Sequence, residues 1–323
     1  MAATYTPKTL LQAVRYYSDL AVCQELLVEA RWPDGVSCPT CGRTDVSYLE
    51  TQKRWQCKTK HARRQFSVKV GTIFEDSPIG LDKWFTAMWL IAGAKNGISS
   101  YELHRAIGVT QKTAWFLNHR IRLAMQTGSF NKPCGTVEVD ETFIGGKARF
   151  MHKDRKARAL KTKTGGSVGK VAVQGLLERH SKTGHSTIRT AVVKNTRSEH
   201  IQAVVRANVE AGSNVYTDAL GSYRGLGPSY NGEYVHKVID HAEKYVDGQV
   251  HTNGCENFWS LLKRSIRGTY VSVEPFHLFR YLDEQVYRFN NRHDNDAGRF
   301  AGVLASVTGR RLTYKDLIGE QPA

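Results

Sequence analysis

The stretch that most constrains the fold of this chain is GTVEVDETFIGG, from Gly135 to Gly146. Its β-branched residues alternate and two glycines end it, which predicts a β-strand followed by a turn. In such a strand Val137 and Val139 point to one side. Glu138 and Asp140 point to the other side, where a metal ion or solvent could meet them. By itself, an Asp that closes a strand and enters a glycine turn is the better explanation. Two later acids reverse that weighing and predict a central strand that carries Asp140.

The first of these acids ends a second predicted strand. Residues 215–217 form a short apolar run, and Asp218 follows it before a turn that contains glycine. The second acid, Glu256, lies on a helix that is expected to begin after Gly254, and at 100° per residue this helix has separate polar and apolar faces. The polar face contains Glu256, Ser260, Lys263 and Arg267, and the apolar face contains Phe258, Leu261 and Leu262. An isolated helix of this kind would present its polar face to solvent and do nothing more.

Three carboxylates in the order strand, strand, helix suit a hard divalent cation, because such cations prefer oxygen ligands. Enzymes that transfer phosphoryl groups with two metal ions hold the pair about 3.5 to 4 Å apart between converging carboxylates. We therefore expect Asp140, Asp218 and Glu256 to bind two Mg²⁺ or Mn²⁺ ions.

The three acids and their surroundings resemble the DDE transposases, which have an RNase H-like fold. The spacing from Asp218 to Glu256, and the base Lys263 two helical turns later, are part of this resemblance. The chain is most similar to the IS1595-type (ISXO2-like) insertion-sequence transposases, through VDETFIGGK, VYTDALGSY, HTNGCENFWSLLKRSIRGTY and FNNRHDNDAGRF. The resemblance implies an α/β fold in which an RNase H-like mixed sheet is flanked by helices and preceded by a zinc ribbon and a helix-turn-helix segment. It also implies that Asp140 acts with the other two acids in catalysis, while Lys263 positions a phosphate.

The charge of the chain favours a polyanionic partner. Its 46 Lys and Arg residues outnumber its 30 Asp and Glu residues, which gives a formal charge of +16. Nucleic acid is the leading candidate. An anionic membrane is the weaker one, because the longest apolar run, residues 84–94, is too short to span a bilayer and no signal peptide precedes it. We therefore expect a cytoplasmic, nucleoid-associated protein that forms a homo-oligomer on DNA and has no small-molecule substrate.

The sequence Cys38-Pro-Thr-Cys41-Gly predicts a knuckle that holds a zinc ion through two thiolates. Cys57 and His61 supply a thiolate and an imidazole further on, so the four residues predict a Cys3His zinc ribbon with one structural ion. In the resembled family the second knuckle often has two cysteines, and the alternative for His61 is a surface histidine in a basic loop. The other cysteines lack ligand spacing and are expected to be small buried hydrophobes: Cys23, Cys134 and Cys255.

Residues 101–107 and 111–125 are expected to form two helices joined by a turn that contains a glycine, which is the layout of a helix-turn-helix. The SSYE sequence that begins at Ser99 is typical of a capping box at the start of the first helix. Lys112 and Arg120 on the second helix are the residues expected to contact DNA. An ordinary pair of packed helices is the alternative.

Residues 147–163 contain eight Lys or Arg residues and one acid, Asp154. Like charges at this density oppose independent folding, so we expect an arm that becomes ordered against phosphates. A loop that only aids solubility is the alternative. The expected DNA contacts of the arm and of the Glu256 helix are Lys153, Arg155, Lys156, Arg158, Lys263, Arg264 and Arg267.

The remaining patterns predict a single leading helix over residues 9–30, further strands over 171–177, 187–193 and 234–239, and helices over 198–210 and 275–291. The last helix should pack on the sheet through Phe276, Phe279, Tyr281, Val286 and Phe289. The expected domains are a leading helix (1–30), a zinc ribbon (31–76), a helix-turn-helix-like DNA-binding segment (77–130), a catalytic domain (131–300) and a carboxyl-terminal tail (301–323).

The combined expectation is a DNA transposase. Residue chemistry alone predicts metal-dependent phosphoryl transfer, and the resemblance supplies cleavage at element ends followed by strand transfer into target DNA. An RNase H-fold nuclease or resolvase is the nearest alternative enzyme. A non-catalytic DNA-binding regulator derived from a transposase is the alternative without chemistry.

Overall fold

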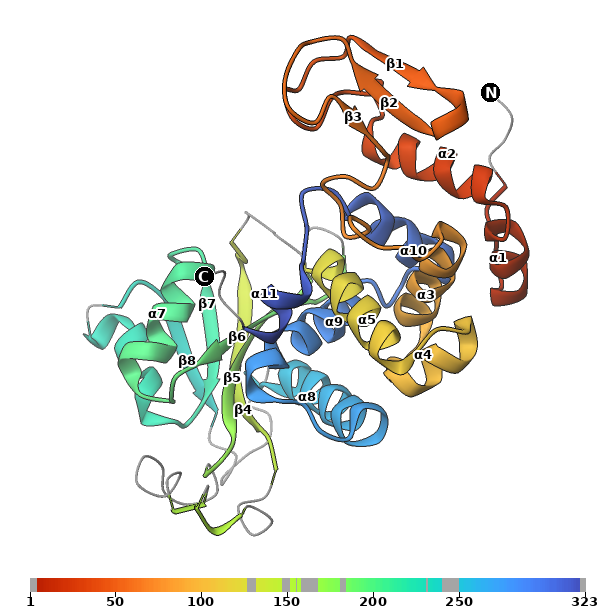
Figure 1. The fold of residues 1–323 in the computed structure, drawn as a ribbon. Helices are drawn as coiled ribbons and strands as arrows, with labels where there is room; N and C mark the ends of the chain where they lie inside the picture. The colour runs from red at the N-terminus through yellow and green to blue at the C-terminus, as the bar shows by residue number, and fades with distance from the viewer. Residues whose placement is uncertain are drawn as a thin grey trace. The chain divides into compact units, whose positions relative to one another are not determined.

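The computed structural model describes residues 5–126, 132–146, 152–154, 156–157, 168–180, 184–230, 232–239 and 250–319. The chain divides into two compact units (Figure 1). The first unit contains residues 1–126 and 291–323, and the second contains residues 127–290. In the part of the chain that the structure describes, no helix has both the length and the apolarity needed to cross a membrane.

The first unit begins with two helices, α1 (Leu10–Tyr17) and α2 (Leu20–Arg31). The expectation of one continuous helix over residues 9–30 is corrected by this break. The Asp19 side chain accepts a hydrogen bond from the Ala21 backbone N–H at 2.8 Å, and so caps the start of a new helix.

The buried side of α1 also differs from the expected one. Leu10 and Val14 are exposed, whereas Tyr17 is buried. The Tyr17 ring stacks on Phe300 with 4.9 Å between ring centroids, and it meets Phe85 edge-on at 5.4 Å. Aromatic packing against other helices therefore decides which side of α1 faces the core, and the spacing of apolar residues within α1 does not reveal it.

A small antiparallel sheet follows, with strands β1 (Val46–Leu49), β2 (Arg54–Cys57) and β3 (Gln65–Phe66) in that order. A 3₁₀ turn, Glu50–Gln52, joins the first two strands. The apolar core of this small sheet is a group of aromatic rings, in which the ring centroid of Trp55 lies 5.5 Å from that of Trp32 and 6.1 Å from that of Phe66. This core is small, so the segment needs further stabilisation from elsewhere.

Three helices complete the amino-terminal part of the unit: α3 (Leu81–Gly93), α4 (Ser100–Ile107) and α5 (Gln111–Met125). The predicted pair of helices with a glycine turn is present as α4 and α5. The capping box of Ser99 with Glu102 starts α4, and Gly108, with a φ of 63°, ends it in a left-handed conformation. Thr110 then caps α5.

The carboxyl-terminal segment belongs to this unit as well. It contains α10 (Asp296–Ala305), which packs on α3, and α11 (Tyr314–Ile318). Phe300 of α10 packs against aromatic residues of α1 and α3, with its ring centroid 5.8 Å from that of Trp89. Residues 291–323 therefore group with the amino-terminal residues, where a division at 300 with a tail was expected.

The second unit is built on a five-stranded mixed sheet with the order β6-β5-β4-β7-β8 (Figure 1). The strands are β4 (Thr136–Ile144), β5 (Val171–Glu178), β6 (Thr187–Val193), β7 (Asn214–Asp218) and β8 (Val235–Ile239). β4, β5 and β6 are antiparallel neighbours, while β4, β7 and β8 are parallel neighbours. The expected α/β fold is confirmed, with the strand that carries Asp140 at the centre of an RNase H-like sheet.

Helices cover both faces of this sheet: α7 (Ser198–Asn208) lies on one side, and α8 (Asn253–Ser265) and α9 (Leu278–Asn290) lie on the other (Figure 1). Val137 and Val139 of β4 are buried in the core beneath α7. The alternate residues of β4 consequently face α8, as the period of two in a strand requires.

The helix expected over residues 275–291 starts later than predicted. Residues Pro275–His277 form a 3₁₀ turn and α9 begins at Leu278. Phe276 and Phe279 are exposed, and Leu278 and Leu282 occupy the core instead. Phe276 lies in the 3₁₀ turn before the helix, and Phe279 lies outside the buried face of α9 that Leu278 and Leu282 define.

Candidate active site and metal-binding cluster

Two aspartates lie level with each other on neighbouring parallel strands. β4 and β7 pair with Glu138 opposite Tyr216, and continuing this register by two residues sets Asp140 level with Asp218. Adjacent strands are about 4.8 Å apart, and residues at the same level of parallel strands point to the same face. The two carboxylates therefore share the face of the sheet that α8 covers.

A tryptophan of α8 donates a hydrogen bond to the first aspartate. Trp259 Nε1 donates a hydrogen bond to Asp140 Oδ2 at 2.9 Å. Gly175 of β5 pairs with Asp140 and makes room for the indole, because a Cβ at this position would lie 2.7 Å from Trp259 Cζ2. Glu256 lies on the first turn of the same helix, three residues before the tryptophan, and so on the same side of α8.

The three acids interact electrostatically. Burial, together with the negative charges of Asp218 and Glu256, raises the pKa of the Asp140 carboxyl to about 6, although the hydrogen bond from Trp259 acts to lower it. A cation bound among the acids would favour the ionised form of all three. Among the described residues, however, the carboxylate oxygens of the three acids do not form a group of close ligand atoms, whereas those of Cys38, Cys41, Cys57 and His61 lie within 4.8 Å of one another. Coordination of one ion by all three acids requires their oxygens to approach one another.

Glu138 does not face a metal ion or solvent, as the sequence suggested it could. It is 1% exposed, and Arg179 Nε donates to its Oε1 at 2.6 Å. Its Oε2 accepts a hydrogen bond from the backbone N–H of Cys255 at 3.1 Å. α8 lacks a side-chain cap at its own N-terminus, so Glu138 performs that role from β4 and fixes the end of the helix that carries Glu256.

A fourth acid, Glu141, is adjacent to the site, and the sequence pattern predicted no role for it. It points to the opposite face from Asp140, where Tyr223 Oη donates to Glu141 Oε2 at 2.6 Å. Burial raises its pKa to about 7, with further contributions from the charges of Asp218 and Asp140. The signal in the sequence was the Asp-Glu pair itself, but the pattern could not show that Tyr223 meets the second acid.

The helix α8 also brings bases to the site. Its faces are as predicted, with Phe258 and Leu262 buried and Glu256 exposed. Burial lowers the pKa of Lys263, as does the charge of Arg267, while the charge of Asp140 opposes this shift. Lys263 therefore lies within electrostatic reach of the first aspartate. Arg264 and Arg267 are exposed.

The four residues predicted to hold zinc are together in the first unit. The ligand atoms of Cys38, Cys41, Cys57 and His61 all lie within 4.8 Å of one another. Cys41 Sγ is 3.7 Å from Cys57 Sγ, and Cys38 Sγ is 3.5 Å from His61 Nε2. Tetrahedral zinc with bonds of about 2.3 Å to sulfur and 2.0–2.1 Å to nitrogen requires separations of about 3.8 Å and 3.6 Å, respectively.

The histidine is in the tautomer that a metal ligand needs. His61 Nδ1 donates to the backbone oxygen of Ala62 at 2.6 Å, which leaves the Nε2 lone pair directed towards the cysteines. The donor set and its spacing fit a structural zinc ion, and they favour the ligand role of His61 over that of a surface histidine in a basic loop. Outside this cluster, Cys23 and Cys255 are buried as predicted, while Cys134 is only partly buried.

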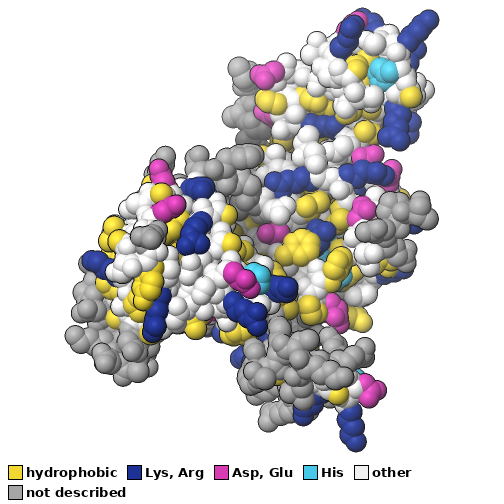
Figure 2. All heavy atoms as spheres, turned by 90° about the vertical axis from the view of Figure 1, so that its left-hand side faces the viewer, with side chains coloured by type: hydrophobic (Ala, Val, Ile, Leu, Met, Phe, Trp, Pro, Cys, Tyr) yellow, Lys and Arg dark blue, Asp and Glu magenta, His cyan; other side chains and the backbone are white. Residues whose placement is uncertain are grey.

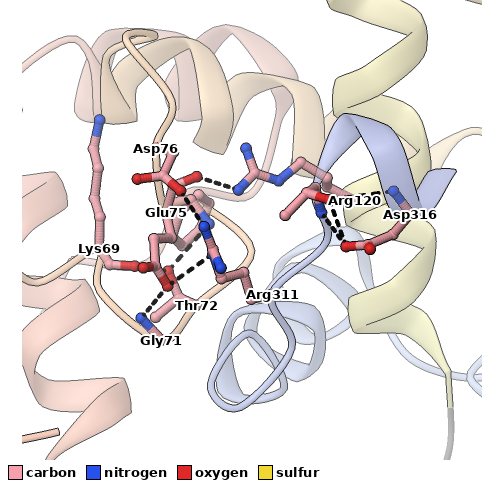
Figure 3. Close-up of polar contacts among 10 residues, drawn as sticks. Lys69, Gly71, Thr72, Glu75, Asp76, Arg120, Arg311 and Asp316 are labelled. Carbon is pink, nitrogen blue, oxygen red and sulfur yellow. Dashed lines mark hydrogen bonds and ion pairs between the residues drawn. The ribbon is translucent and has the colours of Figure 1, made fainter. Parts of the chain in front are cut away.

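Arg120, expected to contact DNA, is buried. Its side chain is 3% exposed, and its guanidinium donates to the backbone oxygen of Glu75. It also lies over the rings of Trp84 and Phe116, 5.5 and 5.1 Å from their centroids. This corrects the expectation, because the Arg120 guanidinium makes an internal contact with the Glu75 backbone (Figure 3).

The neighbouring ion pairs extend this internal network. Arg311 Nη2 lies 2.6 Å from Asp76 Oδ2, and its Nε lies 3.5 Å from Glu75 Oε2 (Figure 3). Lys112, at the start of α5, is exposed instead, with its Nζ 4.8 Å from the centroid of the Tyr314 ring. Lys112 is thus the member of the expected pair that remains accessible to DNA.

Basic residues do not form one continuous patch on the face shown in Figure 2, where Lys and Arg side chains are spread among acidic and neutral ones. Lys153 and Lys156 of the predicted arm are exposed. Arg155 and Arg158 lie outside the described residues.

Family models match both parts of the chain that contain these candidate sites. The model of the ISXO2-like transposase domain matches residues 134–290, which hold all three acids. The model of the transposase zinc-ribbon domain matches residues 19–60.

Two relatives extend the match. An uncharacterized protein in transposable element ISH50 of Halobacterium salinarum is 29% identical over 248 residues, which is 74% of this chain and 80% of that protein. An uncharacterized transposase-like protein of Haemophilus influenzae is 34% identical over 104 residues, which is 32% of this chain and 81% of that protein. With a transposase zinc ribbon in one unit and a transposase domain that coincides with the other, the chain belongs to the IS1595-type, ISXO2-like family of insertion-sequence transposases.

Proposed function

We propose that this protein cuts DNA at the ends of an insertion element and joins the freed end to target DNA, using divalent cations held by Asp140, Asp218 and Glu256. The observation that carries the proposal is the register of β4 and β7, which sets the two aspartates level on one face beneath the helix that carries the glutamate. The charges of Asp218 and Glu256 both contribute to the raised pKa of Asp140, and this interaction of the three acids supports the proposal.

The protein side chains have separate tasks in this reaction. Trp259 occupies Asp140 Oδ2 and so orients the carboxylate, leaving Oδ1 for a cation. Lys263 donates to a non-bridging phosphate oxygen and offsets the charge that develops there. Bound Mg²⁺ or Mn²⁺ would supply Lewis-acid activation of the phosphodiester and of the attacking oxygen.

Two in-line displacements complete the reaction. In the first, the oxygen of water bonds to phosphorus at the element end as the bond to the 3′ oxygen breaks, which leaves a 5′ phosphate and a free 3′ hydroxyl. In the second, that hydroxyl bonds to a phosphorus of target DNA and displaces the 3′ oxygen of the target strand. Both steps are phosphoryl transfers that one set of carboxylates can serve.

The cysteine cluster has no part in this chemistry. Its four protein ligands complete a tetrahedral coordination sphere, so a zinc ion there would have no open position for a substrate. We assign it to the stability of the zinc ribbon and, with Lys112 of α5, to the binding of DNA by the first unit.

The test is incubation of the protein with the ends of its own element and Mg²⁺ or Mn²⁺, followed by strand-resolved sequencing of the products. Asp140→Asn is the inactive control, and Glu210→Gln, an exposed acid just after α7, is the matched control that should remain active. Products in which the element end is joined to a second duplex are expected. Cleavage without joining would identify a nuclease or resolvase, and binding without cleavage would identify a regulator.

A further inference from the structure

The separation of the two aspartates in the proposed active site depends on contacts beyond the ladder between their strands. Among the described residues, the backbone pairing of β4 with β7 ends at Glu138 and Tyr216, two residues before Asp140 and Asp218. Outward from the site the pairing continues, because β4 is paired with β5 through Asp140, and β7 with β8 through Asp218. The ladder between β4 and β7 therefore sets the two aspartates at one level and leaves their separation to other contacts.

One such contact is a hydrogen bond that joins β4 to the turn after β7. This turn is the 3₁₀ segment Gly221–Leu226, and its Tyr223 is fully buried. Tyr223 Oη donates to Glu141 Oε2 at 2.6 Å. Gln174 of β5, which pairs with Glu141 in the sheet, donates from its Nε2 to the same Oη at 3.4 Å. The tyrosine hydroxyl thus bonds to two neighbouring strands beyond the end of the ladder.

The turn that carries the tyrosine is also fixed from α7. Gln202 Nε2 donates to the backbone oxygen of Ser222 at 2.6 Å. Gly225 lets the turn approach this side chain closely, because a Cβ there would lie 2.7 Å from Gln202 Oε1. Arg206 Nη2 donates to that same oxygen at 2.9 Å and so orients the amide. With α7 on one side and β4 on the other, the turn has a defined position against the sheet.

Each aspartate is closely linked to one end of this hydrogen bond. Asp140 precedes Glu141 directly on β4. Asp218 is the last residue of β7, and its Oδ1 accepts a hydrogen bond from the backbone N–H of Leu220 at 3.2 Å, just before the turn. Burial raises the pKa of Glu141 to about 7, and the charges of Asp218 and Asp140 add to this shift. Glu141 therefore lies within electrostatic reach of both aspartates although it points to the other face of the sheet.

We propose that Tyr223 and Glu141 are positioning residues, whose hydrogen bond sets the separation of Asp140 and Asp218 and thereby the affinity of the site for divalent cations. The inference rests on the proposed function, which assigns cations to these aspartates. Two metal ions in such a site lie about 3.5 to 4 Å apart, so a small change in the distance between the carboxylates alters how both are held. A buried carboxylate close to two others costs the fold stability, and packing of the core alone does not explain its presence.

The test measures Mn²⁺ binding to the full-length protein, through the electron paramagnetic resonance of the free ion. Tyr223→Phe should raise the half-saturating Mn²⁺ concentration roughly 10- to 100-fold, which is the usual effect of removing a group that orients metal ligands. Tyr230→Phe, which removes the hydroxyl of an exposed tyrosine a few residues later, is the matched control and should bind Mn²⁺ as wild type does.

Variants of Glu141 separate the hydrogen bond from the charge. Glu141→Gln keeps an oxygen that can accept from Tyr223, and should bind Mn²⁺ nearly as well as wild type. Glu141→Ala removes the acceptor and should match Tyr223→Phe, and the combination of these two changes should cause no further loss. Equal losses in Glu141→Gln and Glu141→Ala would show that the charge acts on the cations directly, and would overturn the positioning role.

Cleavage of element-end DNA gives a second readout. Tyr223→Phe should cut slowly at low Mg²⁺ and approach the wild-type rate when Mg²⁺ is saturating. A role confined to stability predicts a lower melting temperature with an unchanged Mg²⁺ midpoint, and this result would overturn the inference and leave the reaction standing. Weaker Mn²⁺ binding by Tyr223→Phe, when the wild-type protein never cuts, would overturn the reaction and leave the positioning role standing.

Discussion

The two candidate metal sites of this protein are organised in opposite ways. In the cysteine cluster all four ligand atoms already lie within 4.8 Å of one another, and the hydrogen bond from His61 Nδ1 to Ala62 fixes the ligand tautomer. In the carboxylate site, Asp140 is held by Trp259, Asp218 lies on another strand, and Glu256 is exposed on a helix. Hence the first site is complete within the chain, and the second is only partly assembled.

This difference agrees with the proposed function, in which the cysteine cluster serves the fold and the carboxylates serve the reaction. In a closed cluster the free energy of metal binding contributes to the stability of the fold, because the ligands are in position only in the folded chain. A site of like charges that must still converge is destabilising by itself, and it becomes favourable only when cations and substrate enter.

The largest effect is expected from the carboxylates. Asp140→Asn, Asp218→Asn and Glu256→Gln should each bring cleavage of element ends below detection while DNA binding stays near that of wild type, because the lost charge serves the ions. Strand-resolved sequencing and anisotropy measure the two properties, and zinc content should remain at one ion per chain. A variant that cuts at close to the wild-type rate would remove its residue from the assignment.

Loss of the cysteine cluster should act on the fold. Cys57→Ser should release the zinc ion and unfold the zinc ribbon, since metal binding to such sites contributes on the order of 10 kcal/mol. Metal analysis by mass spectrometry and limited proteolysis of residues 31–76 check this. Cys134→Ser, at a partly buried cysteine of the other unit, is the matched control and should retain the metal. A folded, protease-resistant ribbon without zinc would contradict the contrast drawn above.

Acidity should act on the carboxylate site with a predictable sign. The pKa of Asp140 is raised to about 6 in the folded protein, so its stabilising contribution is complete below the unfolded value near 4 and is lost as the pH rises through 6. Asp140→Asn should therefore equal wild type in unfolding free energy near pH 4, and exceed it by about 3 kcal/mol at pH 8. Urea unfolding across this range measures the difference.

Divalent cations sharpen the same experiment. Mg²⁺ should recover much of the loss in wild type at pH 8 and have little effect on Asp140→Asn. Glu210→Gln, with the same loss of one charge at an exposed position, should follow wild type throughout. If Asp140→Asn keeps the pH dependence of wild type, burial of this carboxylate does not cost the protein stability.

The smallest effect concerns Val271, a β-branched residue whose φ of 61° strains the backbone. Val271→Gly should raise the unfolding free energy by about 1 kcal/mol, because relief of the strain exceeds the entropy that glycine adds to the unfolded chain. Val238→Gly, at an exposed position of the edge strand β8, should lower it by about the same amount. Equal destabilisation by the two changes would show that Val271 is not strained in solution.

Local patterns predicted the sheet well, since alternation and glycine turns are properties of a few consecutive residues. The strands expected over 171–177 and 187–193, and the acids at 140 and 218, lie where the sequence indicated. The break between α1 and α2 was missed because an apolar pattern can run through a capping residue such as Asp19 without interruption.

The remaining differences come from partners that are distant in sequence. The helical periodicity around Arg120 predicts an exposed base, whereas its burial depends on the backbone carbonyl of Glu75 and on the aromatic rings around it. Glu138 reads as half of an acidic pair, and its role depends on Arg179 and on the first turn of α8. Val271 carries no local signal at all, because the strain arises where a π-helical turn ends.

The grouping of residues 291–323 with the amino-terminal unit has a consequence for the order of folding. Synthesis of the chain completes the whole of the second unit before Phe300 is made, and until then Tyr17 and Trp89 lack the ring that packs against both of them. Domains usually fold as they emerge from the ribosome. The second unit can therefore fold first, although it comes later in the sequence. The unit with the zinc ribbon and the helix pair α4–α5 is completed only when synthesis is nearly finished.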